Sequence, residues 1–326
     1  MNGKIALEEH FALPDTLGDS EQYAVAGSWT DLQHKLLDLG DRRLREMDRH
    51  GIALAIPSLN SPAVQAIPDA AVAIETARRA NDALADAIAR RPGRFVGFAA
   101  LPMQDPDAAA LELTRSVREL GFKGALVNGF SQRGTRESVV YYDDPAYGPF
   151  WSVIERLAVA FYLHPRDPLL SREPIYDGHP WFRGSAWAFG AETAMHALRL
   201  MASGLFDRHP GLTMILGHLG EGLPYSVWRI DHRLSKSPRG IPARRTMSEY
   251  LRSNVYLTTS GNFRTPTLRN AIAEVGVDRI MFSVDYPFED TADAVAWFDT
   301  AEISEDDRRK IGRENAAALF GLAAAR

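Results

Sequence analysis

The stretch Lys4-Ile-Ala-Leu-Glu-Glu-His10 is a short apolar run that ends on side chains able to bind a metal ion. Seven further apolar runs follow, each ending in a turn and followed by a helix-like stretch. Strand and helix that alternate eight times predict an α/β fold, a closed parallel (β/α)8 barrel of the TIM type. All strand ends of such a barrel open onto one face, where residues far apart in the sequence meet.

The predicted barrel has eight strands, two long loops and extra C-terminal helices. Strands are predicted at residues 5–10, 52–58, 95–101, 124–128, 160–164, 212–218, 254–259 and 279–285. Helices are predicted at 41–50, 69–90, 105–120, 145–158, 191–203, 224–234, 292–301 and 304–322. Long irregular segments, 11–40 and 165–190, follow strands one and five, and we expect the first to cover an active site. Since such barrels run from about 200 to over 400 residues, residues 1–326 are expected to form one domain.

Composition excludes several kinds of site and partner. The chain has no cysteine, which excludes disulfides, thiolate metal sites and a cysteine nucleophile. A net charge of -5 and a pI near 6.0 provide no basic field that would attract nucleic acid. The N-terminus shows no leader-like pattern, and no run approaches the roughly 18 apolar residues of a membrane span. We therefore expect a cytoplasmic protein with neither a nucleic-acid nor a membrane partner.

Four predicted strands end on residue types that bind metals. The first ends with Glu8 and His10, the fifth with His164, the sixth with His218 and the eighth with Asp285. With 42 Asp and Glu and 9 His among 326 residues, chance would place such a residue at about one of eight strand ends. Each residue also has an ordinary explanation, because polar residues occur on exposed strands, single histidines are often structural and an aspartate can cap a helix.

Side-chain alternation separates the residues of the first strand. Glu8 and His10 are predicted to point into the barrel mouth together with the small Ala6. Glu9 is predicted to point toward the helices, where a buried arginine or a backbone donor must satisfy it. Glu9 is therefore the second choice of metal ligand.

The predicted ligand set is Glu8, His10, His164 and Asp285, which offers two carboxylates and two imidazoles. Such nitrogen and oxygen donors without sulfur suit six-coordinate Mn(II) or a more tightly bound Zn(II). The residue types alone leave both ions open. No organic cofactor is expected.

The motif Gly217-His-Leu-Gly-Glu-Gly222 places Glu221 three residues after His218. A carboxylate beside an imidazole fixes its tautomer and raises its pKa, which suits a proton shuttle next to a metal. The ordinary alternative is that Glu221 is an acidic residue in the first turn of the following helix.

Long motifs along nearly the whole chain resemble those of one enzyme family. They are Met1-Asn-Gly-Lys-Ile-Ala-Leu-Glu-Glu-His-Phe11, Gly97-Phe-Ala-Ala-Leu-Pro-Met-Gln-Asp-Pro106, Gly124-Ala-Leu-Val-Asn-Gly-Phe-Ser-Gln132, Phe161-Tyr-Leu-His-Pro-Arg166, Leu216-Gly-His-Leu-Gly-Glu-Gly-Leu-Pro-Tyr225, Thr258-Thr-Ser-Gly-Asn-Phe-Arg264 and Asp285-Tyr-Pro-Phe-Glu289. On these motifs the chain resembles the amidohydrolase superfamily, in the branch of metal-dependent nonoxidative decarboxylases related to aminocarboxymuconate semialdehyde decarboxylase. Within that branch it is most similar to the group that decarboxylates 2,6-dihydroxybenzoate (γ-resorcylate).

The resemblance implies a metal, typically Mn(II) and in some relatives Zn(II), bound by the four predicted ligands, with His218 and Glu221 beside it. Asn128 and Phe288 match positions that line the pocket. Tyr23 stands where the family has an aromatic residue, most often phenylalanine, and its hydroxyl alters the shape of the pocket. Arg229 resembles a residue contributed by a neighbouring subunit of a homotetramer.

The implied reaction is the reversible loss of CO2 from 2,6-dihydroxybenzoate to give resorcinol. Because an aryl carbanion is unfavourable, the ring must be protonated first, and Asp285 is expected to supply this proton while the metal chelates the carboxylate and an ortho phenolate. His218, oriented by Glu221, is expected to hold the second ortho hydroxyl, and Asn128 with Arg229 to orient the other polar groups.

Three alternatives remain open at this point. The first is a decarboxylase of another hydroxybenzoate, of the 2,3-dihydroxybenzoate type. The second is a metal-dependent hydrolase of the same fold, in which Asp285 is the base. The third is a non-catalytic protein that binds a small molecule without a metal.

Overall fold

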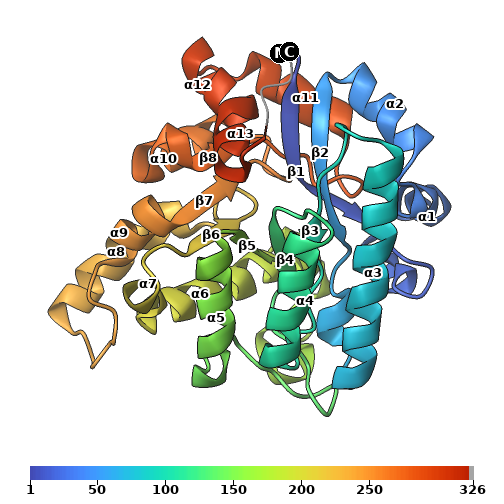
Figure 1. The fold of residues 1–326 in the computed structure, drawn as a ribbon. Coiled ribbons are helices and arrows are strands. Elements are labelled where there is room, and N and C mark those ends of the chain that lie inside the picture. The colour runs from blue at the N-terminus through green and yellow to red at the C-terminus, as the bar shows by residue number, and fades with distance from the viewer. Residues whose placement is uncertain (323–326) are drawn as a thin grey trace.

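Eight parallel strands form the barrel over residues 1–322, the part of the chain that the computed structural model describes; the last four residues of the predicted domain, 323–326, lie outside it (Figure 1). The strands are β1 Lys4–Phe11, β2 Ile52–Leu59, β3 Phe98–Ala99, β4 Gly124–Asn128, β5 Ala160–His164, β6 Thr213–Leu216, β7 Val255–Thr258 and β8 Ile280–Met281. Each strand pair in the two ladders is parallel and joins neighbours in sequence order.

Isolated bridges complete the ring. One ladder joins β1 to β2 and a second runs from β3 to β8. A parallel bridge between Ala55 and Phe95 links β2 to the residues before β3, and another between Glu9 and Tyr286 links β1 to the residues after β8. The predicted (β/α)8 barrel is therefore confirmed.

Helices surround the barrel. They are α1 Trp29–Leu37, α2 Asp41–Arg49, α3 Ala70–Arg90, α4 Pro106–Arg118, α5 Gly148–Leu157, α6 Ala188–Ala202, α7 Leu205–Arg208, α8 Leu223–Lys236, α9 Met247–Asn254, α10 Thr265–Val275, α11 Thr291–Thr300, α12 Glu305–Arg309 and α13 Asn315–Phe320. Local chemistry sets their starts: Asp69 and Asp105 each accept two backbone N–H groups at the start of α3 and α4, as helix-capping residues do. Figure 1 shows α3, α4 and α5 side by side outside the strands.

The barrel interior is apolar at the end that α13 covers and polar at the opposite end, where the strands finish. Residues such as Leu7, Phe98 and Tyr162 form an inner cluster, and Phe320 of α13 covers it, with its ring 5.6 Å from that of Phe98. Because α13 closes one end of the barrel, the open face is the one formed by the carboxyl-terminal ends of the strands. Barrels of this kind carry out their chemistry at that face.

The prediction that Ala6 shares the face of Glu8 and His10 was wrong. Ala6 packs in the cluster between the strands and the helices, whereas Leu7 packs inside the barrel. The register of β1 on β2 shifts between Ala6 and Glu9, and such an irregularity interrupts the alternation of side chains. Leu7 and Glu8 can therefore both face the interior.

Two other local predictions need correction. The segment 11–40 is not wholly irregular, because it contains a 3-10 helix, Leu17–Tyr23, and α1. Strands six and eight were predicted to reach His218 and Asp285 but end at Leu216 and Met281. The φ angles of His218 and Asp285 are 52° and 79°, in a left-handed region that a strand cannot contain.

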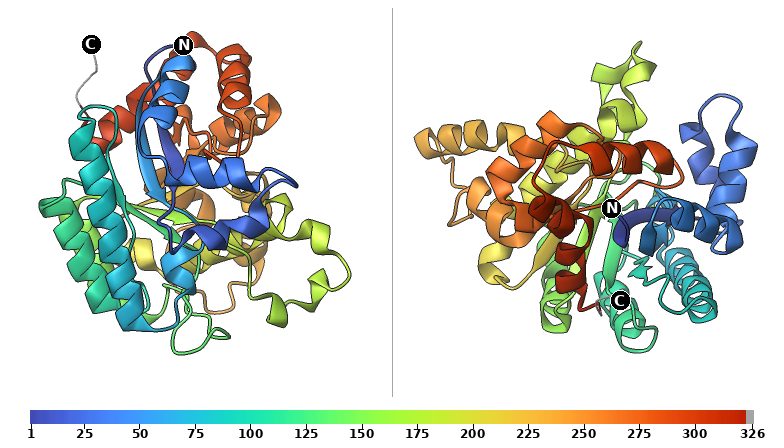
Figure 2. Two further views of the ribbon diagram at one scale, coloured as in Figure 1. Left: turned by 90° about the vertical axis from the view of Figure 1, so that its right-hand side faces the viewer. Right: turned by 90° about the horizontal axis from the view of Figure 1, so that it is seen from above.

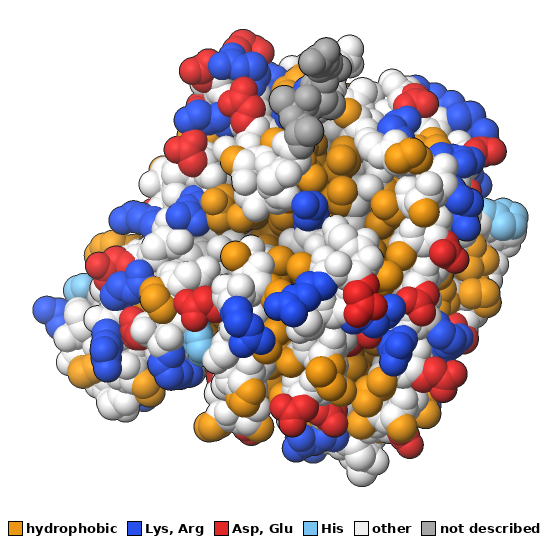
Figure 3. Space-filling view, in the orientation of Figure 1, with side chains coloured by type: hydrophobic (Ala, Val, Ile, Leu, Met, Phe, Trp, Pro, Cys, Tyr) orange, Lys and Arg blue, Asp and Glu red, His pale blue; other side chains and the backbone are white. Residues whose placement is uncertain are grey.

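The surface carries both signs of charge. Figure 3 shows Lys and Arg side chains beside Asp and Glu over the face that it draws. Figure 2 shows the segment after β5, which consists of short 3-10 turns before α6, projecting from the barrel. Within residues 1–322, no helix has both the length and the apolar character needed to cross a bilayer.

Candidate metal and catalytic site

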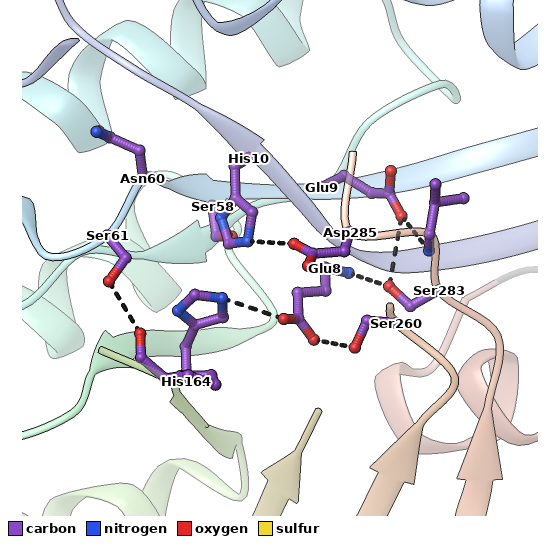
Figure 4. Close-up of polar contacts among 12 residues, drawn as sticks. Glu8, Glu9, His10, Ser58, Asn60, Ser61, His164, Ser260, Ser283 and Asp285 are labelled. Atoms are coloured by element: carbon purple, nitrogen blue, oxygen red, sulfur yellow. Dashed lines mark hydrogen bonds and ion pairs between the residues drawn. The ribbon is translucent and has the colours of Figure 1, made fainter. Parts of the chain in front are cut away.

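Four side chains from distant parts of the chain meet at the open end of the barrel. One ligand atom from each of Glu8, His10, His164 and Asp285 lies within 4.8 Å of the other three (Figure 4). The Nε2 atom of His164 is 3.1 Å from Oε1 of Glu8. The Nε2 atom of His10 is 3.3 Å from Oδ1 of Asp285. Two atoms that bind one cation at about 2.1 Å lie at most about 4.2 Å apart, so the two spacings of 3.1 and 3.3 Å fit a shared ion.

Buried atoms without partners indicate that a metal fits here. Glu8 and His10 are fully buried. Among residues 1–322, neither Oε1 of Glu8 nor Nε2 of His10 has a hydrogen-bond partner. Leaving a buried carboxylate oxygen unpaired is costly, and a divalent cation between these atoms would compensate both.

The charge states suit a cation. Burial alone would raise the pKa of Glu8, but the neighbouring imidazoles of His218 and His164 outweigh burial and hold that pKa well below its usual value. Burial lowers the pKa of His10, which keeps its ring neutral. An ionised carboxylate and a neutral imidazole are the forms that coordinate metals.

The backbone brings Asp285 to β1, although β8 ends four residues earlier. The Asp285 N–H donates to the Glu8 carbonyl at 3.0 Å, and the His10 N–H donates to the Tyr286 carbonyl at 2.6 Å. The left-handed φ of Asp285 is a strained conformation for a residue with a side chain. Pairing with β1 supports that conformation and directs the carboxylate toward the imidazole of His10.

Glu9, the second choice of ligand, lies outside this group. Figure 4 shows its side chain pointing away from the other four. The Val284 N–H donates to Oε1 of Glu9 at 3.0 Å, and the guanidinium of Arg43 lies nearby. Burial raises the pKa of Glu9 to about 8. A backbone donor and a buried arginine thus surround Glu9, as predicted from its orientation.

His218 and Glu221 form a pair next to this group. Oε1 of Glu221 is 2.7 Å from Nδ1 of His218. The Nε2 atom of the same ring is 3.5 Å from Oδ2 of Asp285. Burial opposes protonation of His218, but the carboxylates of Glu221 and Glu8 raise its pKa well above the usual value. Gly261 makes room for the ring, because a Cβ at this position would lie 2.9 Å from Cδ2 of His218.

Neither ordinary explanation holds: Glu221 is not an acid in the first turn of α8, and Asp285 is not a helix cap. Glu221 precedes Gly222, the residue before α8, and its carboxylate contacts His218. The side chain that caps α11 belongs to Asp290, whose carboxylate accepts two backbone N–H groups. Asp285 is therefore not a helix cap.

A cavity of about 550 Å³ opens beside the pair and gives a small molecule access to it. His218, Glu221, Phe189, Ile230 and Asn262 are among its lining residues. The His218 side chain keeps 21% of its surface exposed, so a ligand in the cavity can reach the imidazole.

The predicted pocket residues lie at different distances from this site. Asn128 is buried at the end of β4, opposite His164 in the strand register. The Phe288 ring lies 5.7 Å from that of His10. Tyr23 packs edge-on against Phe189, which lines the cavity, at 5.1 Å.

Tyr23 and Arg229 do not lie against the four metal-ligand side chains of this subunit. Burial and the nearby Asp167 carboxylate raise the pKa of Tyr23, so its hydroxyl lies near the loop that follows β5. Arg229 is exposed on α8 and is not among the residues that line the cavity of this chain. A single subunit therefore does not bring Arg229 into its own site.

Sequence reasoning missed three hydroxyl groups around Glu8. They belong to Tyr162, Thr258 and Ser260. All three residues lie in the family-like motifs, and Tyr162 stands two residues before His164 on the same face of β5. That spacing was the available signal.

Comparison with known proteins identifies the family. A family model described as Amidohydrolase matches residues 37–322. The chain belongs to the amidohydrolase family. The chain is 61% identical over 324 residues to the gamma-resorcylate decarboxylase of Rhizobium radiobacter, with 99% of each chain covered. The resemblance inferred from the sequence motifs is thus confirmed.

Solved structures agree with this assignment. A crystal structure of 2,6-dihydroxybenzoate decarboxylase complexed with 2,6-dihydroxybenzoate has a TM-score of 0.97 and 60% identity to this chain, and the match covers 99% of this chain and 100% of the other. The dihydroxybenzoic acid decarboxylase of Polaromonas sp. JS666, with bound manganese and the inhibitor 2-nitroresorcinol, has a TM-score of 0.97 and 59% identity, with 100% and 98% covered.

Proposed function

We propose that this chain is a metal-dependent carboxy-lyase that converts 2,6-dihydroxybenzoate to resorcinol and CO2 and that also catalyses the reverse reaction. The observation that carries the proposal is the convergence of two carboxylates and two imidazoles within 4.8 Å. Relatives support the proposal, because the chain is about 60% identical over its full length to enzymes named for this activity.

The proposed metal ligands are Glu8, His10, His164 and Asp285, with one divalent ion per subunit and no organic cofactor. Mn(II) is the proposed ion because the similar Polaromonas structure contains manganese, and Zn(II) is the alternative that the donor set allows. When bound, the ion would supply a Lewis acid that neutralises charge on the substrate carboxylate and an ortho phenolate.

Asp285 is proposed as the acid that protonates the ring carbon bearing the carboxylate. The proton adds to that carbon, the bond between the ring and the carboxylate then breaks, and its electrons restore aromaticity as CO2 leaves. The Asp285 carboxyl lies beside His10 at one edge and 3.5 Å from His218 at the other. His218 can therefore return a proton to Asp285 for the next turnover.

His218 and Glu221 are proposed to hold and orient the substrate. With Nδ1 bonded to Glu221, the Nε2 atom of His218 faces Asp285 and can contact the second ortho hydroxyl. Asn128 is proposed to contact the substrate through Oδ1, which is buried and without a hydrogen-bond partner among the described residues. Phe288 and Tyr23 are proposed as aromatic walls.

Replacing Glu221 by glutamine should lower kcat for 2,6-dihydroxybenzoate by about 10-fold to 100-fold, as loss of a group that orients a site imidazole typically does. Glutamine keeps the size of the side chain but removes the charge that holds His218. Glu155→Gln is the matched control, because Glu155 pairs in the same way with His209 at 3.0 Å outside the site. Steady-state kinetics of both variants give the answer, and equal rates for parent and Glu221→Gln would refute this role.

Incubation of Mn(II)-loaded protein with a panel of hydroxybenzoates, followed by identification of the phenolic product, tests the function. We expect resorcinol and CO2 from 2,6-dihydroxybenzoate at the highest kcat/KM. Preference for 2,3-dihydroxybenzoate would move the assignment to a neighbouring specificity. Turnover of lactones or amides alone would indicate a hydrolase.

We also propose a cytoplasmic homotetramer in which Arg229 reaches the site of a neighbouring subunit. Arg229 lies on α8 beside Trp228, and Tyr225 one turn earlier is 85% exposed. Exposed aromatic side chains grouped on one helix are typical of a protein interface. Light scattering of the purified protein should give four times the 36.1 kDa mass of the chain, and a monomer would contradict the proposal.

A further inference from the structure

Three buried hydroxyl groups surround one oxygen of Glu8. Oε2 accepts hydrogen bonds from Tyr162 and Ser260, and Thr258 Oγ1 lies 3.4 Å away. The hydroxyls also contact each other, because Thr258 Oγ1 is 2.7 Å from the Tyr162 oxygen and 2.9 Å from Oγ of Ser260. Tyr162, Thr258 and Ser260 are each fully buried. We call these three residues the hydroxyl clamp.

The directions of the bonds follow from the donors available. An ionised carboxylate only accepts, so Tyr162 and Ser260 must each donate their single hydrogen to Glu8. The Tyr162 oxygen is then left as an acceptor for Thr258. Ser260 Oγ also accepts the His218 N–H at 3.1 Å. The clamp thus joins the Glu8 carboxylate to the backbone of the proposed substrate-binding histidine.

The other oxygen of Glu8 is in the opposite situation. Oε1 is buried, has no hydrogen-bond partner among the described residues and lies 3.1 Å from Nε2 of His164. On the side of the hydroxyl clamp, the backbone of Gly217 packs directly against the carboxylate, because a Cβ on Gly217 would lie only 2.7 Å from Oε2. One carboxylate therefore has a saturated oxygen and an unpaired oxygen that faces the other three ligands.

We propose that the hydroxyl clamp positions Glu8 so that only Oε1 is offered to the metal. This inference rests on the proposed metal site and concerns how the protein builds it. A carboxylate held through one oxygen occupies a single coordination position, which leaves more positions for a chelating substrate. The clamp also prevents rotation of the carboxylate, so the ligand atom is in place before the ion arrives, as outer hydrogen bonds do at other metal sites.

Tyr162→Phe tests the clamp by removing one hydroxyl and no other atom. We expect the Kd for Mn(II), measured by titration with electron paramagnetic resonance detection of free ion, to rise about 10-fold to 100-fold. Tyr142→Phe is the matched control. Tyr142 is also fully buried, and its hydroxyl bonds to Ser131 at 2.9 Å, away from the metal ligands. The control should bind Mn(II) within about threefold of the parent.

A second pair keeps the test decisive if Tyr162→Phe does not fold. Thr258→Val removes a clamp hydroxyl at constant shape, and Thr258→Ser retains it. We expect weaker Mn(II) binding in the valine variant and recovery in the serine variant, with both folded by circular dichroism. Parent-like Kd values for folded Tyr162→Phe and Thr258→Val would overturn the clamp while leaving the proposed function intact. A parent that binds no Mn(II) would overturn both.

Discussion

The Asp285→Asn variant will decarboxylate 2,6-dihydroxybenzoate at least about 10³-fold more slowly than the parent, which corresponds to about 4 kcal/mol of added barrier. Asparagine keeps an oxygen that can coordinate a metal, but it carries no acidic proton for the ring carbon. The substrate should still bind, because the other three ligands and the His218 and Glu221 pair are unchanged. The loss should therefore appear in kcat, with little change in Mn(II) content.

Asp290→Asn is the control for this variant. It makes the same chemical change five residues later, at the residue that caps α11. Asparagine is also a good capping residue, so this control should keep both its fold and its kcat. Single-turnover kinetics and metal analysis of the two variants give the comparison. Full activity of metal-loaded Asp285→Asn would refute the proton role.

Removing the metal with a chelator will have an effect of similar size. Without the ion, the negative charge of the substrate carboxylate and phenolate would face the carboxylates of Glu8 and Asp285 uncompensated. We expect activity to fall at least about 10³-fold, the scale set by the loss of electrostatic stabilisation of a transition state. Addition of Mn(II) should restore it.

Metal analysis of the same samples makes the chelation experiment conclusive. Residual activity should track the residual metal content. The midpoint of thermal unfolding should also rise on adding Mn(II), because an ion that binds the folded state stabilises it. Unchanged turnover in protein shown to be metal-free would exclude a metal-dependent reaction.

The barrel was predictable because its signal is repeated and local. The runs at residues 124–128 and 160–164 were predicted at the bounds that the structure has. Four helices of the described residues, α1, α7, α9 and α10, were not predicted. The apolar periodicity of α1, α9 and α10 is close to that of α3 and α4, and Thr246 with Glu249 forms a capping box at the start of α9, so the signal for these three was present in the sequence. The end of β8 could not be read from hydrophobicity, because Phe282 and Val284 continue the apolar pattern past Met281. At β6 the apolar run stops at Leu216, where the strand ends, and the predicted strand was extended too far, to His218.

The candidate site was predictable in composition but not in detail. Glu8, His10, His164 and Asp285 are residue types that bind metals, and their convergence follows once the barrel is assumed. The hydroxyl of Tyr162 had a weaker signal, its position two residues before His164, because a tyrosine in a strand is usually a core residue. Alternation alone predicted that Glu8 points inward, but not the register shift in β1 that lets Leu7 face the interior as well. The sequence does not display that shift.

The most direct test of the central claim is the anomalous difference map of a crystal of the Mn(II)-loaded protein. The four-ligand site predicts one peak per subunit, about 2.1 Å from Oε1 of Glu8 and within bonding distance of His10, His164 and Asp285. A manganese peak at another place in the subunit would contradict the four-ligand site. So would a bound manganese that one or more of these four side chains does not contact.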